Sequence, residues 1–200
     1  MKPQLISVNQ LNKQSHTAYY DLLYKHANGM TQHYQMLSRN TDLNKDNLGK
    51  NNIDAITMLI YRKSSKDVNE YLITKEFRLP INNFVLSFPA GLIEKSEDIK
   101  TAAIREIKEE TGIICNQYTK FDFQRPILSS PGITDELGQI VIIELYGSET
   151  FGQKELEDTE IISTKWMTYN EINNVLDNEQ IHIGNHAYVH IQKLEILNQI

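Results

Sequence analysis

The segment at residues 98–111 is the feature that most constrains how this chain folds. On a helix that turns by about 100° per residue, its apolar side chains form one stripe that must pack on the body of the protein. The stripe consists of Ile99, Ala102, Ala103 and Ile107. Ser96 or Asp98 can cap the start of this helix, and Gly112 is placed to end it. The chain must therefore supply an apolar surface that covers the stripe.

Three glutamates lie on or beside the apolar stripe of this helix. Glu106, Glu109 and Glu110 are three and four residues apart, so their side chains are neighbours. Like charges at this spacing repel, and partial burial disfavours their ionised forms, so a positive group should lie between them. A hard divalent cation such as Mg²⁺ fits, because it prefers oxygen ligands. The alternative is a solvated helix end, since Glu is a good helix former.

The stretch from Gly91 to Ile113 matches a known family pattern at every specified position. GLIEKSEDIKTAAIREIKEETGI resembles the Nudix box, which is a Gly, five residues, a Glu, seven residues, then Arg-Glu-aliphatic-x-Glu-Glu-x-Gly-aliphatic. The matching residues are Gly91, Glu97, Arg105, Glu106, Ile107, Glu109, Glu110, Gly112 and Ile113. A chance match has a probability on the order of 10⁻¹⁰ per window at average residue frequencies. The resemblance therefore favours the metal hypothesis over the solvated helix end.

The resemblance implies a Nudix-type α/β/α sandwich with a mixed sheet, and catalysis that depends on Mg²⁺ or Mn²⁺. The metal ligands that it implies are the carbonyl of Ala90 and the carboxylates of Glu106, Glu109 and Glu110. Glu109, Glu97 and Arg105 belong to the catalytic set of the box. Of these, Glu97 and Arg105 are expected to stabilise the loop-helix-loop, because an arginine can hold a carboxylate in a rigid bidentate pair.

The segments that flank the box resemble the ADP-ribose pyrophosphatase branch of the family. In EFRLP, Arg78 matches an arginine that contacts substrate phosphate. In SPGITDE, Pro131 matches a proline of the branch and Glu136 matches a loop glutamate that activates the water. Glu136 could also be an ordinary turn acid, in which case Glu160 or a box glutamate is the base. Ser87 departs from the branch, which often has Glu at this position.

The N-terminal region predicts a β-hairpin between Tyr19 and Arg39. Two β-rich runs flank Asn28 and Gly29, the pair that most readily adopts the positive φ angles of a tight turn. A hairpin alone is marginally stable, so it should pack on the body of the protein or on another copy of the chain. It resembles the strands that this branch exchanges across a homodimer, in which Arg39 reaches the substrate of the partner.

The rest of the chain alternates strand-like and helix-like patterns. Strand-like runs occupy residues 54–61, 70–77 and 140–146. Thr168 and Glu171 have the spacing of a capping box that starts a helix, and a last helix is expected at 187–197. This order indicates an α/β arrangement with a mixed sheet. We expect residues 1–50 to form the N-terminal hairpin, linker and dimerisation element, and residues 51–200 to form the Nudix hydrolase domain.

Composition excludes several other classes of protein. The formal net charge of −6 argues against a general nucleic-acid surface. No apolar run approaches the roughly 20 residues that cross a bilayer, and the N-terminus has no apolar core of a secretion signal, so we expect a cytoplasmic protein. Cys115 has no partner for an internal disulfide and is expected to be a core thiol. His182, His186 and His190 are expected to be solvated or capping residues rather than metal ligands.

These features predict hydrolysis of the diphosphate bond of ADP-ribose or a related nucleoside diphosphate sugar, giving a nucleoside monophosphate and a sugar phosphate. The partner is then a nucleoside diphosphate-linked small molecule. The alternatives are a UDP- or GDP-sugar hydrolase, a nucleoside triphosphate pyrophosphohydrolase and a non-catalytic ADP-ribose sensor. The SPGITDE segment favours a diphosphate-linked sugar over a triphosphate. The complete set of box carboxylates disfavours the sensor.

Overall fold

The computed structural model divides the chain into two compact units. It describes residues 1–50, 52–147, 149–156, 161–179 and 181–197. The first unit consists of Met1–Ala55 and Pro126–Gln139, and the second consists of Ile56–Arg125 and Ile140–Ile200. Each unit has its own buried apolar cluster.

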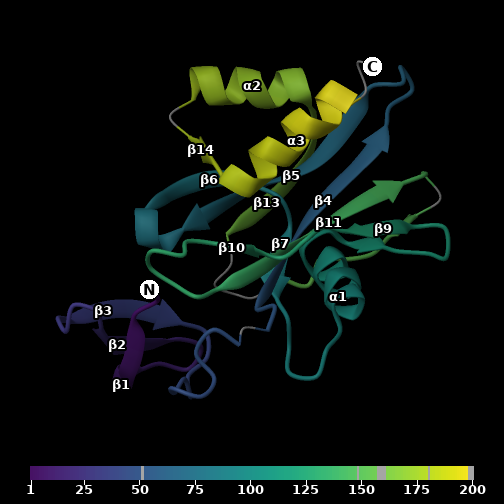
Figure 1. The fold of residues 1–200 in the computed structure, drawn as a ribbon. Coiled ribbons are helices and arrows are strands. Elements are labelled where there is room, and N and C mark those ends of the chain that lie inside the picture. Colours follow the sequence, from purple (N-terminus) through teal and green to yellow (C-terminus); the bar gives the residue numbers. More distant parts are fainter. Residues whose placement is uncertain (51, 148, 157–160, 180, 198–200) are drawn as a thin grey trace. The chain divides into compact units, whose positions relative to one another are not determined.

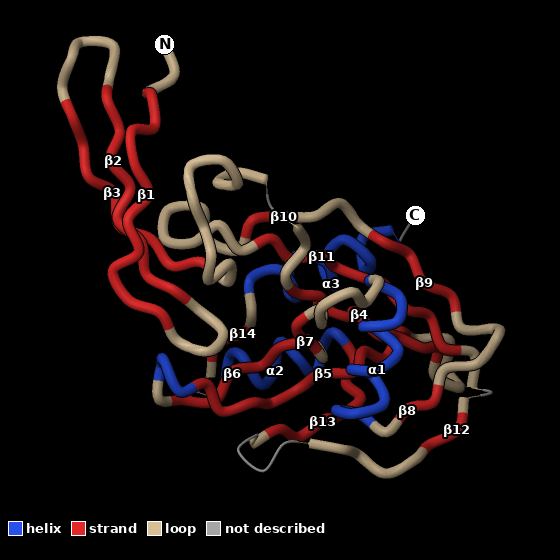
Figure 2. Tube along the Cα trace, turned by 90° about the horizontal axis from the view of Figure 1, so that it is seen from below, coloured by secondary structure: helices blue, strands red, loops and turns tan. Residues whose placement is uncertain are grey.

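The first unit contains an antiparallel sheet in the order β1-β2-β3 (Figure 2). Its strands are β1 Gln4–Lys13, β2 Ala18–Lys25 and β3 Thr31–Ser38. The expected hairpin is present as β2 and β3, and the sheet has a third strand that was not predicted, because β1 pairs with β2 along most of its length. Most β1 side chains are exposed, so its sequence lacks the alternation that marks a half-buried strand.

The turn of the hairpin also differs from the expected two-residue turn. The His26 N–H donates to the Met30 carbonyl at 2.8 Å, and the Gly29 N–H donates to the His26 carbonyl at 2.9 Å. Gly29 alone of the expected pair has a positive φ, +86°. Asn28 instead accepts a hydrogen bond from the Met30 N–H on its side-chain oxygen. The loop therefore has three residues and places glycine at the left-handed position.

The loop after β3 is tied to the sheet of the first unit by Tyr20. The Tyr20 hydroxyl donates to the Asn40 carbonyl at 2.8 Å and accepts from the Leu43 N–H at 3.1 Å. The buried cluster of the unit consists of Ala18, Tyr20, Leu22, Met36 and Leu43. Residues 40–50 form an irregular segment, and the buried Leu43 anchors it.

The second unit is built on a sheet whose central order is β11-β4-β5-β6-β14. These strands are β4 Ala55–Lys63, β5 Asn69–Arg78, β6 Asn83–Ser87, β11 Leu137–Leu145 and β14 His182–Ile183. Three more strands pair beside them, namely β7 Ala90–Leu92 on β4, β9 Lys120–Phe123 on β11 and β13 Ile162–Thr168 on β5. β14 is parallel to β6, whereas β5 is antiparallel to β6 and β13, so the sheet is mixed as predicted.

The chain also contains several short elements. They are the 3₁₀ turn η1 Leu79–Ile81, the pair β8 Ile113–Ile114 with β12 Thr150–Phe151, and β10 Ile127–Leu128, which pairs with the first residues of β11 inside the first unit. The helices are α1 Ile99–Thr111, α2 Tyr169–Asn178 and α3 Asn185–Leu197. None of the helices in the described ranges has the length and apolar character needed to cross a membrane.

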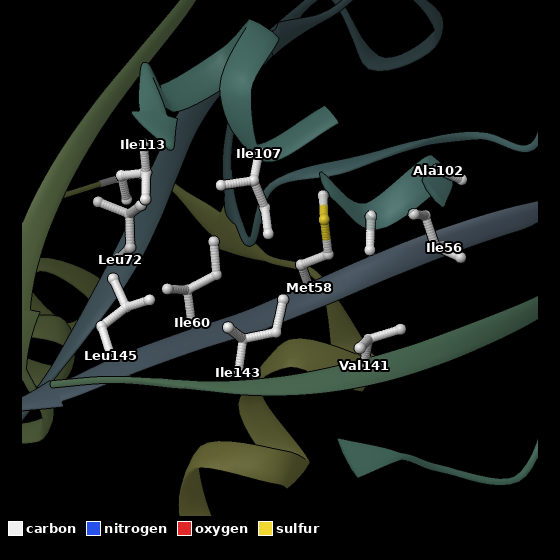
Figure 3. Close-up of a cluster of buried hydrophobic side chains, with 11 residues drawn as sticks. Ile56, Met58, Ile60, Leu72, Ala102, Ile107, Ile113, Val141, Ile143 and Leu145 are labelled. Atoms are coloured by element: carbon white, nitrogen blue, oxygen red, sulfur yellow. The ribbon is translucent and has the colours of Figure 1, made fainter. Parts of the chain in front are cut away.

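Helices cover both faces of the sheet in the second unit, with α1 on one side and α2 and α3 on the other (Figure 1). Side chains alternate along a strand, so Leu72 of β5 joins the cluster under α1 while Tyr71 and Ile73 join the cluster under α2 and α3. In Figure 3, Ile107 of α1 points toward Met58 and Ile60 of β4. The predicted α/β/α sandwich is confirmed.

Both ends of α1 follow from local sequence. The Asp98 carboxylate accepts hydrogen bonds from the N–H groups of Lys100 and Thr101, which fixes the start of the helix. Gly112 ends it with φ of +73°, the left-handed conformation that glycine adopts most readily. The stripe of Ala102, Ala103 and Ile107 is fully buried. α2 likewise begins at the predicted capping box of Thr168 and Glu171.

Candidate functional site

The loop before α1 is fixed to the helix by Arg105. Its Nε and Nη2 atoms donate to the two carboxylate oxygens of Glu97 at 3.0 and 2.9 Å, and Nη2 also donates to the Leu92 carbonyl. The same Glu97 carboxylate accepts a hydrogen bond from the Glu94 N–H. These bonds hold the pKa of Glu97 below its ordinary value and raise that of Arg105. The bidentate pair expected from the sequence is present.

The three box glutamates lie along α1 with different exposure. The Glu106 side chain is 13% exposed and that of Glu109 is 33% exposed, whereas Glu110 is buried, with 6% of the residue exposed. Arg105 Nη1 donates to Glu106 Oε1 at 2.8 Å and to Glu109 Oε2 at 3.0 Å. In this structure the positive group expected among the carboxylates is therefore the Arg105 guanidinium.

Gly91 lies directly against the Glu106 carboxylate. A Cβ atom added at Gly91 would lie 1.8 Å from Glu106 Oε1, far inside van der Waals contact. Residue 91 must therefore be glycine for Glu106 to keep this position. Ala90, whose carbonyl is an expected metal ligand, comes immediately before Gly91 in β7. The strand thus brings its backbone up to the carboxylate of the helix.

The donor set suits a hard divalent cation. Carboxylate and backbone carbonyl oxygens are the ligands that Mg²⁺ and Mn²⁺ prefer, and the missing Cβ of Gly91 leaves the room in which the Glu106 carboxylate lies against the backbone. Across the described part of the chain, no three acidic, histidine or cysteine side chains converge as a metal centre. Two of the candidate ligands, Glu106 and Glu109, are instead directed to Arg105.

Arg78 is the expected phosphate-binding residue and lies at the end of β5. Its Nη2 atom is 3.0 Å from Glu76 Oε2, and 51% of its side chain is exposed. The guanidinium is therefore accessible and is oriented by Glu76. Ser87, the departure from the family branch, pairs with Thr74 across β5 and β6, and a Cβ at Gly184 would lie 3.3 Å from Ser87 Oγ.

Arg39 and Glu136 form an ion pair inside the first unit. Arg39 Nε donates to Glu136 Oε2 at 2.8 Å. The loop that contains Pro131 is bonded to β3, because the Leu37 N–H donates to the Ile133 carbonyl and the Tyr34 hydroxyl to the Gly132 carbonyl. The Arg39 guanidinium, expected at a partner's substrate, thus contacts a carboxylate of its own chain.

The structure groups the expected site residues in two sets. Arg39, Pro131 and Glu136 belong to the first unit. Arg78, Ala90, Glu97, Arg105, Glu106, Glu109 and Glu110 belong to the second. Glu160, the alternative base, and the side chain of His186 lie outside the described residues. Cys115 packs partly buried against the apolar cluster under α1, where burial raises the pKa of its thiol.

Asp54 is a residue of the first unit that the sequence did not single out. Its N–H donates to the Leu137 carbonyl at 2.8 Å, and its Oδ2 accepts from the Leu137 N–H at 2.9 Å. A cavity of about 310 Å³ lies beside it and is lined by Ser38, Arg39, Asn40, Leu43, Asn47, Lys50, Asn52, Asp54 and Asp135. An aspartate before a strand is a common turn residue, so the sequence carried no signal for this role.

The fold is a mixed sheet between helices. Its loop-helix-loop carries an Arg–Glu pair and three glutamates, and the backbone of a glycine lies against one of these glutamates. Together these features define the Nudix class of α/β proteins. The family model described as NUDIX domain matches residues 52–186, and the chain belongs to this family.

Known proteins support the same assignment. The chain is 35% identical over 144 residues to the ADP-ribose pyrophosphatase of Saccharomyces cerevisiae, covering 70% of this chain and 59% of that protein. It is 28% identical over 130 residues to the ADP-ribose pyrophosphatase of Bacillus subtilis, covering 65% and 68%. A crystal structure of an ADP compounds hydrolase superposes with a TM-score of 0.65 at 17% identity, covering 90% and 85%, which shows a shared fold.

Proposed function

We propose that this protein is a divalent-cation-dependent hydrolase that cleaves the diphosphate bond of ADP-ribose or a related nucleoside diphosphate sugar. The products are a nucleoside monophosphate and a sugar phosphate. The observation that carries the proposal is the Glu106 carboxylate held against the Gly91 backbone, with Glu109 and Glu110 on the next turn of α1. The names of the yeast and Bacillus relatives support the substrate class.

The metal ligands in this proposal are the Ala90 carbonyl and the carboxylates of Glu106, Glu109 and Glu110. When Mg²⁺ or Mn²⁺ is bound, it neutralises the diphosphate and lowers the pKa of the attacking water. Arg105 keeps Glu106 and Glu109 in position through its hydrogen bonds. Glu97 fixes Arg105 in turn, so the loop and the helix hold their relative positions during the reaction.

The substrate contacts in this proposal come from Arg78, Arg39 and Pro131, and Glu136 accepts the proton of the attacking water. The exposed guanidinium of Arg78 can donate two parallel hydrogen bonds to a phosphate. We also propose a homodimer that forms through the N-terminal sheet. Exposed apolar side chains of the first unit, among them Leu11 and Met30, support this interface.

A turnover panel tests the proposed function. ADP-ribose, UDP-glucose, GDP-mannose, diadenosine polyphosphates and nucleoside triphosphates are incubated with Mg²⁺ or Mn²⁺, and the products are separated by chromatography. We expect AMP and ribose 5-phosphate from ADP-ribose at the highest rate, and no turnover with a chelator. A higher rate with a UDP- or GDP-linked sugar would replace the substrate. Binding of ADP-ribose without turnover of any compound would support a sensor instead.

A further inference from the structure

We propose that Asp54 is a positioning residue for Glu136, acting through a two-bond clamp on the backbone of Leu137. The inference rests on the role proposed for Glu136 above. Asp54 lies far from Glu136 in the sequence and directly before β4, whereas Glu136 lies directly before β11. All of the groups involved belong to the first unit.

The clamp fixes the residue that follows Glu136. Asp54 donates its N–H to the Leu137 carbonyl at 2.8 Å, and its side-chain Oδ2 accepts from the Leu137 N–H at 2.9 Å. Both polar groups of the Leu137 backbone are therefore bonded to one residue. The Leu137 N–H belongs to the peptide that follows Glu136, and the Leu137 carbonyl belongs to the next peptide, so the clamp restrains one peptide on each side of Leu137.

The backbone of Glu136 is also held from within its own loop. Its N–H donates to Thr134 Oγ1 at 3.1 Å, and its carbonyl accepts from the Ser129 N–H at 3.0 Å. Together with the clamp on Leu137, these bonds fix the peptides on both sides of Glu136. The direction of its Cα–Cβ bond is set accordingly.

The carboxylate end of Glu136 is held by a residue of the same frame. Arg39 Nε donates to Glu136 Oε2 at 2.8 Å, and Arg39 directly follows β3, to which the loop is bonded through Leu37 and Ile133. The side chain of Glu136 is 22% exposed, so solvent can still reach it. A base must lie within hydrogen-bond reach of the proton that it accepts. The bonds from Arg39 and from the loop backbone restrict where the Glu136 carboxylate can lie.

The clamp depends on an acceptor oxygen at position 54 more than on a charge. The side chain of Asp54 accepts from a backbone N–H, and the amide oxygen of asparagine can accept in the same way. Burial raises the pKa of Asp54, and the nearby carboxylates of Asp135 and Glu136 raise it further, while the Leu137 N–H and Arg39 oppose this. A neutral acceptor therefore fits these surroundings.

The test compares Asp54→Ala, Asp54→Asn and Glu136→Gln with the double variant Asp54→Ala/Glu136→Gln. Asp46→Ala is the matched control, because Asp46 is an exposed aspartate of the preceding loop. We expect Asp54→Ala to lower kcat by roughly 10- to 100-fold with little change in KM, because a base displaced by about 1 Å reacts far more slowly. Asp54→Asn should restore most of the lost kcat, and Asp46→Ala should match the unmodified protein.

Two further readouts separate positioning from a general loss of structure. In the Glu136→Gln background, Asp54→Ala should cause no additional loss of kcat, because both changes act through the same group. Amide hydrogen exchange measured by NMR should show faster exchange of the Leu137 N–H in Asp54→Ala and unchanged exchange in Asp54→Asn.

Each contrary result identifies which statement fails. The inference is overturned if Asp54→Asn is as damaging as Asp54→Ala, if the two losses multiply in the double variant, or if Leu137 exchange is unchanged in Asp54→Ala. If Glu136→Gln keeps full turnover, the proposed base is wrong and the positioning role falls with it. If the unmodified protein hydrolyses nothing in the panel, the proposed function itself fails.

Discussion

Arg105 connects the structural part of the loop-helix-loop to the candidate metal ligands. One side of its guanidinium bonds to Glu97, and Nη1 bonds to Glu106 and Glu109. The three carboxylates carry more negative charge than one arginine can offset. A bound divalent cation would complete the neutralisation, which is why the same residues suit a metal site.

Glu110 provides the sharpest test of the metal assignment at this scale. It is buried on α1, and glutamine has nearly the same shape, so Glu110→Gln should leave the fold intact. Loss of a metal-ligand charge should lower kcat with Mg²⁺ on the order of 100-fold or more, since each factor of ten corresponds to about 1.4 kcal/mol of activation free energy.

A matched control for this prediction is Glu94→Gln. Glu94 is exposed in the loop before α1, and its carboxylate is not an expected ligand. Turnover should remain near that of the unmodified protein. Equal losses in both variants, measured under the same cation concentration, would mean that the Glu110 carboxylate has no special role.

The Glu97–Arg105 pair predicts a pH dependence of stability. Hydrogen bonds from Arg105 lower the pKa of Glu97 in the folded state below its ordinary value of 4.5. A depressed folded pKa contributes stability that is fully present above about pH 4.5 and is lost as the pH falls through the folded pKa. The free energy of unfolding should therefore fall in acid, partly because of this residue.

Urea unfolding of Glu97→Gln at neutral pH and at about pH 3 measures this contribution. At neutral pH the variant should be less stable by about 1.5–3 kcal/mol, the typical net contribution of hydrogen bonds to a charged group. It should also lose less stability in acid than the unmodified protein. An identical acid dependence in the two proteins would show that the pair does not titrate in this range.

At the scale of elements, the end of α1 is determined by a steric contact as well as by conformation. Gly112 has φ of +73°, and a Cβ there would lie 2.6 Å from the carbonyl oxygen of Gly152. Gly147 has a similar φ of +79° with no atom within 4 Å of its Cβ position. A residue with a side chain would therefore be strained by the left-handed conformation at both positions. Only at position 112 would its Cβ also clash with a neighbouring atom.

Alanine variants of the two glycines separate these effects. Gly147→Ala should cost about 1–2 kcal/mol, the strain of the left-handed conformation. Gly112→Ala should cost more, because the added methyl group also displaces the backbone at Gly152. Thermal unfolding of both variants gives the comparison, and equal destabilisation would mean that the backbone at Gly152, which follows β12, shifts without cost.

Elements with local signals were predictable from the sequence, whereas those that depend on distant partners were not. The helix expected at 98–111 is α1, because its stripe and both caps lie within the same short segment. β1 was missed, because most of its side chains are exposed and leave no alternation. The Asp54 clamp joins residues 83 apart, and no local pattern reports such a contact. The same is true of the pair between Arg39 and Glu136.

At the scale of the whole molecule, the chain passes between the two units three times. The first unit takes Pro126–Gln139 from the middle of the chain, so its loop with Glu136 is covalently joined to the second unit at both ends. The second unit carries the α1 glutamates on a core of strands and helix. Binding of a cation to the glutamates should therefore stabilise the folded state of the molecule by mass action.

Thermal unfolding with and without Mg²⁺ measures this coupling without any substrate. At a cation concentration of about 100 times Kd, the folded state should gain about 2.7 kcal/mol. For a chain of this length, that gain raises Tm by roughly 5–10 °C. Glu110→Gln should show a much smaller shift, and Glu94→Gln should show the full shift, because only the former removes an expected ligand. Equal shifts in both variants would place the cation elsewhere on the protein.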